Sequence, residues 1–312
     1  MSKYSYDTGN RLTQVTNDNG TTYGYDNDND NDGNVTSGAF TGSLSYNTTA
    51  NQVSTSGFGY DGAGNLTADP SNGTLSYNDA GQLISASDAA GNGGSSETIS
   101  YAGASQDQSL ADGSATSVVY GLAGQRGQPW VDSYDAGGGT DYVIRDQQGD
   151  PLGFTCGGTS YMFVTDNVGS VTAIVSCSGV LSGTYGYTPY GALASKSAAR
   201  GGSLVDENLI GYTGALTDQM TAGSTGYVHD GSRWYDSASG AFTSQDASSY
   251  LSNPPTATAT PTPPTTPPTT PTQQARASTA ALRRQVLELA EDLWRWEQAS
   301  SESPQRRLAS GL

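Results

Sequence analysis

A short turn pattern recurs along the front half of this 312-residue chain. Each copy has Tyr followed by Asp or Asn, then two or three small residues, then Gly or Ala with Asn or Gln, and finally Leu or Val. Clear copies start at Tyr6, Tyr60 and Tyr77, a looser one runs from Tyr46 to Val53, and a stretched one from Tyr25 to Val35. The Asp or Asn side chain can bond the backbone two residues on, and Gly supplies the positive φ that closes a turn. Each copy therefore predicts a β-hairpin.

A series of such hairpins must pair side by side, because one hairpin alone is marginally stable in water. The composition agrees, since 41 glycines and 19 tyrosines against 5 phenylalanines are typical of a glycine-punctuated β protein. From residue 141 to about 191, three tighter strand pairs follow, with turns at 146–149, 157–158 and 166–169. The sequence therefore predicts an all-β meander up to about residue 251, with 1–140 as a repeat sheet and 141–251 as a second unit.

The chain changes character after residue 251. Residues 254–272 hold eight of the 13 prolines, interleaved with threonine, so 252–277 is predicted to be a stiff, solvated, disordered linker. An apolar stripe with helical spacing follows at Leu282, Val286, Leu289, Leu293 and Trp296. We expect one amphipathic helix over 278–299 and a disordered tail over 300–312.

The net charge limits the kinds of partner that the chain can bind. Thirteen Lys and Arg against 30 Asp and Glu give a net charge of −17, so we expect no binding to nucleic acid. We also expect no membrane insertion, because no stretch approaches 18 consecutive apolar residues. The first residues, MSKYSYDTGN, have no apolar signal region, and we expect the chain to be the carboxy-terminal piece of a longer protein.

The repeats resemble the YD repeats of RHS-repeat proteins, and four ordered motifs from 161 to 246 resemble the RHS repeat-associated core. These motifs are Thr165-Asp166-Asn167-Val168-Gly169-Ser170-Val171, Tyr187-Thr188-Pro189-Tyr190-Gly191, Tyr212-Thr213-Gly214, and a closing set of Ser232-Arg233-Trp234-Tyr235-Asp236, Gly240-Ala241-Phe242 and Gln245-Asp246. The resemblance covers residues 4–251. It implies a β-sheet that curves into a partly closed shell, as in polymorphic toxins, where such a shell holds a carboxy-terminal effector.

The same resemblance implies an aspartyl-type self-cleavage. Carried over to this chain, Asp236 and Asp246 would be the catalytic carboxyls, Arg233 would orient them, and the cut would fall between Leu251 and Ser252. Ala247 stands where the family has Pro, and Ser249 stands near its expected Gly. The alternative is structural: Asp236 opens a turn as other such aspartates do, and Arg233 pairs with it.

Other chemistry-bearing residues have plain alternatives. The run 28–33 resembles half a calcium loop, but Ala39 stands where the bidentate Glu is required, so we expect a solvated turn and no metal or other cofactor. Cys156 and Cys177 are expected at the same rim of the sheet, either as a disulfide or as two free thiols. His229, the only histidine, is expected to face solvent.

These observations favour a structural role. We expect a secreted or cell-surface shell fragment whose partner is its own carboxy-terminal segment or a larger parent shell. The alternative is an adhesin that binds cell-wall carbohydrate through a face containing Trp130, Trp234 and the many tyrosines, although aromatic packing within the sheet is the more frequent reason for such residues.

Overall fold

In the computed structural model of the chain, the elements are almost all β. The structure describes residues 3–16, 20, 22–27, 34–38, 42–47, 49–71, 73–87, 96–102, 108–112, 117–121, 130–199, 203–218, 227–231 and 233–245. The predicted linker, helix and tail over 252–312 lie outside these residues, as do the run 28–33 and Ala39.

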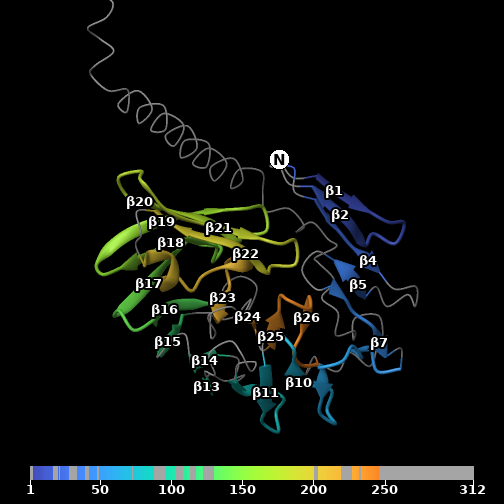
Figure 1. Cartoon of the computed structure of the whole chain (residues 1–312). Helices are drawn as coiled ribbons and strands as arrows, with labels where there is room; N and C mark the ends of the chain where they lie inside the picture. Colours follow the sequence, from blue (N-terminus) through green and yellow to red (C-terminus); the bar gives the residue numbers. More distant parts are fainter. Residues whose placement is uncertain are drawn as a thin grey trace, which may run out of the picture.

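Within the described residues, two large sheets form most of the outer layer of the molecule, which we call the wall (Figure 1). The six-stranded sheet, called the repeat sheet below, consists of β9 (Gly59–Tyr60), β10 (Leu66–Asp69), β11 (Gly73–Tyr77), β12 (Leu83–Ser87), β13 (Ser96–Ala102) and β14 (Gln108–Asp112). The eight-stranded sheet consists of β15 (Ser117–Tyr120), β16 (Val131–Asp135), β17 (Thr140–Arg145), β18 (Pro151–Cys156), β19 (Thr159–Thr165), β20 (Val171–Ser176), β21 (Leu181–Tyr187) and β22 (Leu193–Ala198).

Smaller sheets continue the wall at the amino end and fill its centre. The amino-terminal ones are β1 (Lys3–Tyr6), β2 (Leu12–Thr16) and β3 (Thr22–Gly24), then β4 (Asp26–Asn27), β5 (Val35–Gly38) and β6 (Gly42–Ser43), then β7 (Tyr46–Asn47) with β8 (Gln52–Val53). The central sheet is β23 (Leu216–Asp218), β24 (Tyr227–Asp230), β25 (Arg233–Asp236) and β26 (Ala241–Phe242). A one-turn helix α1 (Leu204–Glu207) and a 3₁₀ turn η2 (Tyr212–Gly214) precede it.

Every sheet is an antiparallel meander, in which each strand pairs with its neighbours in sequence. The predicted hairpin meander is therefore confirmed. The eight-stranded sheet starts at β15, so it continues across the expected boundary at residue 140 without a break.

The repeated turn has the same hydrogen bonds in copy after copy. Oδ1 of Asp61 accepts the backbone N–H groups of Ala63 and Asn65, both at 2.9 Å. Oδ1 of Asn78, Asp146 and Asp166 accepts the N–H groups two and four residues on in the same way. Gly64, in the turn of Asp61, has φ +87°, a conformation that favours glycine. One side-chain oxygen thus holds each loop closed.

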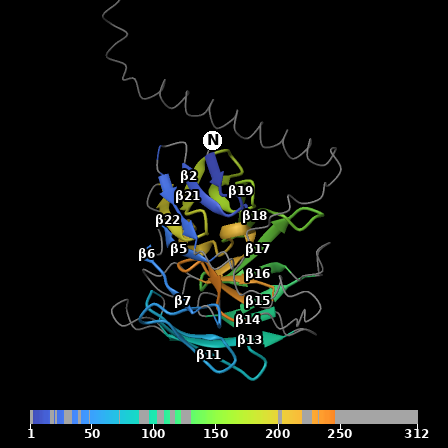
Figure 2. The same ribbon diagram turned by 90° about the vertical axis from the view of Figure 1, so that its right-hand side faces the viewer.

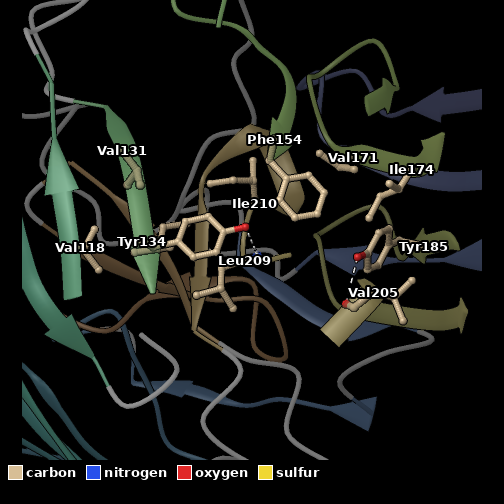
Figure 3. Packing of buried hydrophobic residues seen from close by; sticks show 11 residues of the cluster. Val118, Val131, Tyr134, Phe154, Val171, Ile174, Tyr185, Val205, Leu209 and Ile210 are labelled. Atoms are coloured by element: carbon tan, nitrogen blue, oxygen red, sulfur yellow. Dashed lines mark hydrogen bonds between the residues drawn. The ribbon is translucent and has the colours of Figure 1, made fainter. Parts of the chain in front are cut away.

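The core lies on the concave side of the wall, and residues 204–242 supply much of it. In one cluster, side chains of the eight-stranded sheet pack against Val205, Leu209, Ile210 and Leu216 (Figure 3). There the Tyr134 hydroxyl accepts the Leu209 N–H, and the Tyr185 hydroxyl donates to the Val205 carbonyl. In a second cluster, the six-stranded sheet packs against Tyr227 and Trp234. Figures 1 and 2 both show β25 and β26 at the centre, with sheets around them.

Candidate functional site

The hairpin of β25 and β26 carries the predicted catalytic aspartate, and its turn is buried. Residues 234–240 are all buried, and Asp236 has no exposed surface at all. Turns normally lie at the protein surface, because their backbone polar groups need water or other partners. Here the surrounding sheets enclose the turn, so its polar groups find partners inside the protein.

Asp236 opens its turn differently from the repeat aspartates. Its Oδ1 accepts the Ala238 N–H at 2.9 Å, and its Oδ2 accepts the Ser239 N–H, also at 2.9 Å. The Gly240 N–H completes the turn by donating to the Asp236 carbonyl. The predicted structural alternative, in which Asp236 opens a turn, therefore describes what this residue does. The same bonds fix both carboxyl oxygens in a dry environment.

A second buried carboxyl comes from the repeat sheet. Asp69, at the end of β10, is 3% exposed, and its Oδ1 accepts the Ser71 N–H at 2.8 Å. Burial, and after it the negative charge of Asp69, raises the pKa of Asp236 to about 7. Sequence reasoning did not find Asp69, because Asp69-Pro70-Ser71-Asn72-Gly73 has the pattern of an ordinary turn.

A cavity of about 200 Å³ lies between Asp69 and the turn that Asp236 opens. Residues from four separate stretches of the chain line it, and most of them are polar or small. They include Ser43, Thr55, Ser56, Asp69, Ser71 and Ser239. A cavity of this volume has room for about six waters. The arrangement therefore places the Asp69 carboxyl next to hydroxyl groups, which is a setting for acid–base chemistry on a small group.

The chain leaves the hairpin along the repeat sheet. The Thr243 carbonyl accepts the Leu66 N–H at 2.7 Å and the Tyr77 hydroxyl at 3.0 Å. The Thr243 N–H donates back to the Trp234 carbonyl at 2.8 Å. The start of the carboxy-terminal segment is thus bonded to the inner side of β10 and β11.

Of the other residues of the predicted cleavage site, the structure describes only Arg233. The Arg233 guanidinium lies over the Phe242 ring, 3.7 Å from its centroid, and its charge acts to lower the pKa of Asp230 against a larger increase from burial. Asp246, Leu251 and Ser252 lie outside the described residues. The pairing of Asp236 with Asp246, the role of Arg233 and the cut itself stay predictions.

Comparison with known proteins identifies the fold. The family described as the teneurin YD-shell matches residues 1–264. The chain belongs to the YD-shell family. A comparison with curated proteins found no match.

Solved structures give the same fold for this YD-shell chain. The complex of TcdB2, TccC3 and Cdc42 matches with a TM-score of 0.56 at 17% identity, covering 78% of this chain. The Tc holotoxin pore of Photorhabdus luminescens, with a mutated TccC3, matches with a TM-score of 0.55 at 16% identity over the same 78%. This chain covers 14% of the length of each matched chain. The YD-shell fold and a structural role as part of a shell follow.

The prediction for His229 was wrong. It lies on β24 of the central sheet and is 7% exposed, so it is buried and not at the surface. Its Nδ1 contacts the Tyr120 hydroxyl at 3.1 Å, and its ring lies 4.6 Å from that of Trp234. The buried Nε2 has no hydrogen-bond partner among the described residues, and burial lowers the pKa of His229 to about 4. The sequence pattern suggested a strand with one face in solvent, but β24 belongs to the central sheet and other strands cover it.

Both cysteines of the YD-shell are free thiols in the structure. They lie at the same rim, as expected, since Cys177 donates to the carbonyl of Ser160, which follows the turn after Cys156. Cys156 packs against the core, however, and donates to Glu207 on α1, whereas Cys177 is exposed. The free-thiol alternative is therefore the one that this structure has.

The aromatic residues proposed for sugar binding are used in packing. Trp234 is 1% exposed and donates from Nε1 to the Tyr101 hydroxyl at 2.7 Å. Trp130 lies under the Arg145 guanidinium, 6.0 Å from the ring centroid. Both contacts correspond to the packing explanation.

Two further searches cover the described residues only. In that part of the chain, no group of three His, Cys, Asp or Glu side chains is placed to hold a metal ion. None of its helices has the length and apolar character required to cross a membrane.

Proposed function

We propose that this chain forms the closing part of a secreted or surface-exposed YD-shell that holds its own carboxy-terminal segment. The observation that carries the proposal is the position of Thr243, whose carbonyl is bonded to Leu66 and Tyr77 of the repeat sheet. The segment after the hairpin of β25 and β26 therefore starts on the concave side of the wall. A chain that starts there can be retained by the shell around it.

We further propose that the shell cuts this segment free once, between Leu251 and Ser252. Asp236 and Asp246 would act as the carboxyl pair, with Arg233 orienting them. The ionised carboxyl takes a proton from water, whose oxygen bonds to the peptide carbon, and the protonated carboxyl donates to the peptide oxygen. The C–N bond then breaks as its nitrogen takes the proton of one carboxyl, while a hydroxyl of the tetrahedral intermediate gives a proton to the other carboxyl, so the pair again holds one proton.

The carboxyl environment supports this second proposal. An acid that must donate a proton near neutral pH needs a raised pKa, and Asp236 has one, about 7, because it is buried and because Asp69 is nearby.

Intact-mass measurement and gel filtration of the purified full chain test both proposals together. We expect two fragments that meet between Leu251 and Ser252 and elute together, and only the full-length mass in the Asp236→Asn variant. Fragments that elute separately would contradict retention by the shell. A wild-type chain that stays at full mass at every pH would contradict self-cleavage.

A further inference from the structure

The repeat sheet packs against the hairpin of β25 and β26, and we call this contact the seam. It contains two buried carboxyls from distant parts of the chain. Asp69 closes β10 and is 3% exposed, while Asp236 closes β25 and is fully buried. The cavity described above is lined by Asp69 on one side and by Ala238 and Ser239, from the turn of Asp236, on the other. Asp69 therefore lies across a small space from the turn that Asp236 opens.

Acidic groups act on one another at this seam. Asp69 on β10 raises the pKa of Asp236, and both aspartates raise the pKa of Tyr60 on β9, where burial has the larger effect. Asp236 also adds to the increase at Tyr235, its neighbour on β25, whose pKa is raised chiefly by burial. A tyrosine hydroxyl is neutral near pH 7 and supplies no positive charge.

Hydrogen bonds to each carboxyl stabilise its ionised form. Asp236 accepts the N–H groups of Ala238 and Ser239, and Asp69 accepts that of Ser71. Two ionised carboxyls that are buried close together repel each other, and the usual outcome is that the pair keeps one proton. The seam has the burial and the charge that lead to this outcome.

We propose that Asp69 is the proton-sharing partner of Asp236, and that it acts as a positioning residue which keeps a proton available on Asp236 near neutral pH. The pair then exists only when the hairpin of β10 and β11 has packed against β25. Its role in cutting rests on the self-cleavage proposed above, whereas the pair itself does not. With Asp236 as the proton donor, Asp246 is left to activate water, so cutting would start only after the repeat sheet has docked.

The pair can be tested without any cleavage. The full chain, with ¹³C-labelled Asp carboxyls, is titrated by NMR from pH 4 to 9, and variants assign the signals. We expect the Asp236 carboxyl to titrate about one unit lower in Asp69→Asn than in the wild type, because a nearby charge has been removed. Asn at position 69 keeps the Oδ1 acceptor for Ser71, so the turn should fold.

Asp146→Asn is the matched control. Asp146 also accepts backbone N–H groups in a hairpin turn, but it lies between β17 and β18 of the other large sheet. The titration of Asp236 should be the same in this variant as in the wild type. If Asp236 titrates at the same pH in Asp69→Asn as in the wild type, the proposed pair is wrong.

Rates of cleavage against pH, measured by intact mass, test the consequence. We expect the pH profile of Asp69→Asn to move toward acid by the same amount as the NMR titration, and that of Asp146→Asn to stay in place. A profile that does not move in Asp69→Asn would overturn the role of Asp69 in cutting. A wild-type chain that shows the coupled titration but no cut supports the pair and overturns only the self-cleavage.

Discussion

Tyr77 donates its hydroxyl hydrogen to the main-chain carbonyl of Thr243, 3.0 Å away and 166 residues later in the chain. Tyr77 comes from a repeat hairpin, and Thr243 follows the last described strand. The same carbonyl accepts the Leu66 N–H. The bond joins the wall of the shell to the point from which the carboxy-terminal segment leaves, so it is a direct place to test how the two depend on each other.

Replacing Tyr77 by Phe should lower the free energy of unfolding by about 1 kcal/mol, because one hydrogen bond is lost while the ring stays packed. Chemical denaturation measures the change. Tyr142→Phe is the control, since Tyr142 is 59% exposed on the outer face and its loss of a hydroxyl should have no effect. Equal stability of Tyr77→Phe and wild type would show that the bond contributes nothing.

Gly64→Ala should destabilise the protein by about 1–3 kcal/mol. Gly64 has φ +87°, and a Cβ there would lie 2.9 Å from Cδ of Gln245. The substitution therefore strains the turn and displaces Gln245, which follows the hairpin of β25 and β26. Gly62→Ala in the same turn is the matched control, because a Cβ at Gly62 meets no atom within 4 Å and its φ is not positive. Thermal unfolding of both variants gives the comparison, and a smaller loss for Gly64→Ala than for Gly62→Ala would refute the argument.

His229 should make the shell less stable in acid. Its pKa is lowered to about 4 by burial, below the ordinary value of about 6.5, so the unfolded chain binds the extra proton first. The stabilisation is complete above pH 6.5 and is lost as the pH falls toward 4, by about 3 kcal/mol in total. Asp236 acts in the opposite direction over the same range, so the difference between wild type and His229→Gln must be measured at each pH. A difference that is constant from pH 7 to pH 4 would contradict the prediction.

The two thiols should react at very different rates. Burial and Glu207 raise the pKa of Cys156 to about 12, which leaves almost no thiolate at pH 8, whereas Cys177 is exposed. A maleimide should therefore label one thiol quickly in the native protein and none quickly in Cys177→Ser. Two thiols should react in denaturant without reductant. If none reacts there, the cysteines form the disulfide that was the other alternative.

Much of the fold could be predicted from the sequence because its turns are local. The Asp or Asn oxygen and the glycine of each repeat lie within five residues, so their bonds form wherever the chain runs, and hairpins such as β11–β12 follow from them. The same local chemistry correctly described Asp236 as a turn opener, although its partners are the N–H groups of Ala238 and Ser239. It could not show that this turn is buried.

The sequence by itself determined the hairpins, their order and the meander, since each depends on residues that are close along the chain. Only the tertiary structure decided that Asp69 lies beside the turn of Asp236, that His229 faces inward, and that Cys156 meets Glu207 and not Cys177. The physical reason is that strand alternation gives two faces but does not say which is covered. That depends on how the wall curves around residues 204–242, and no local pattern encodes the contacts of that packing.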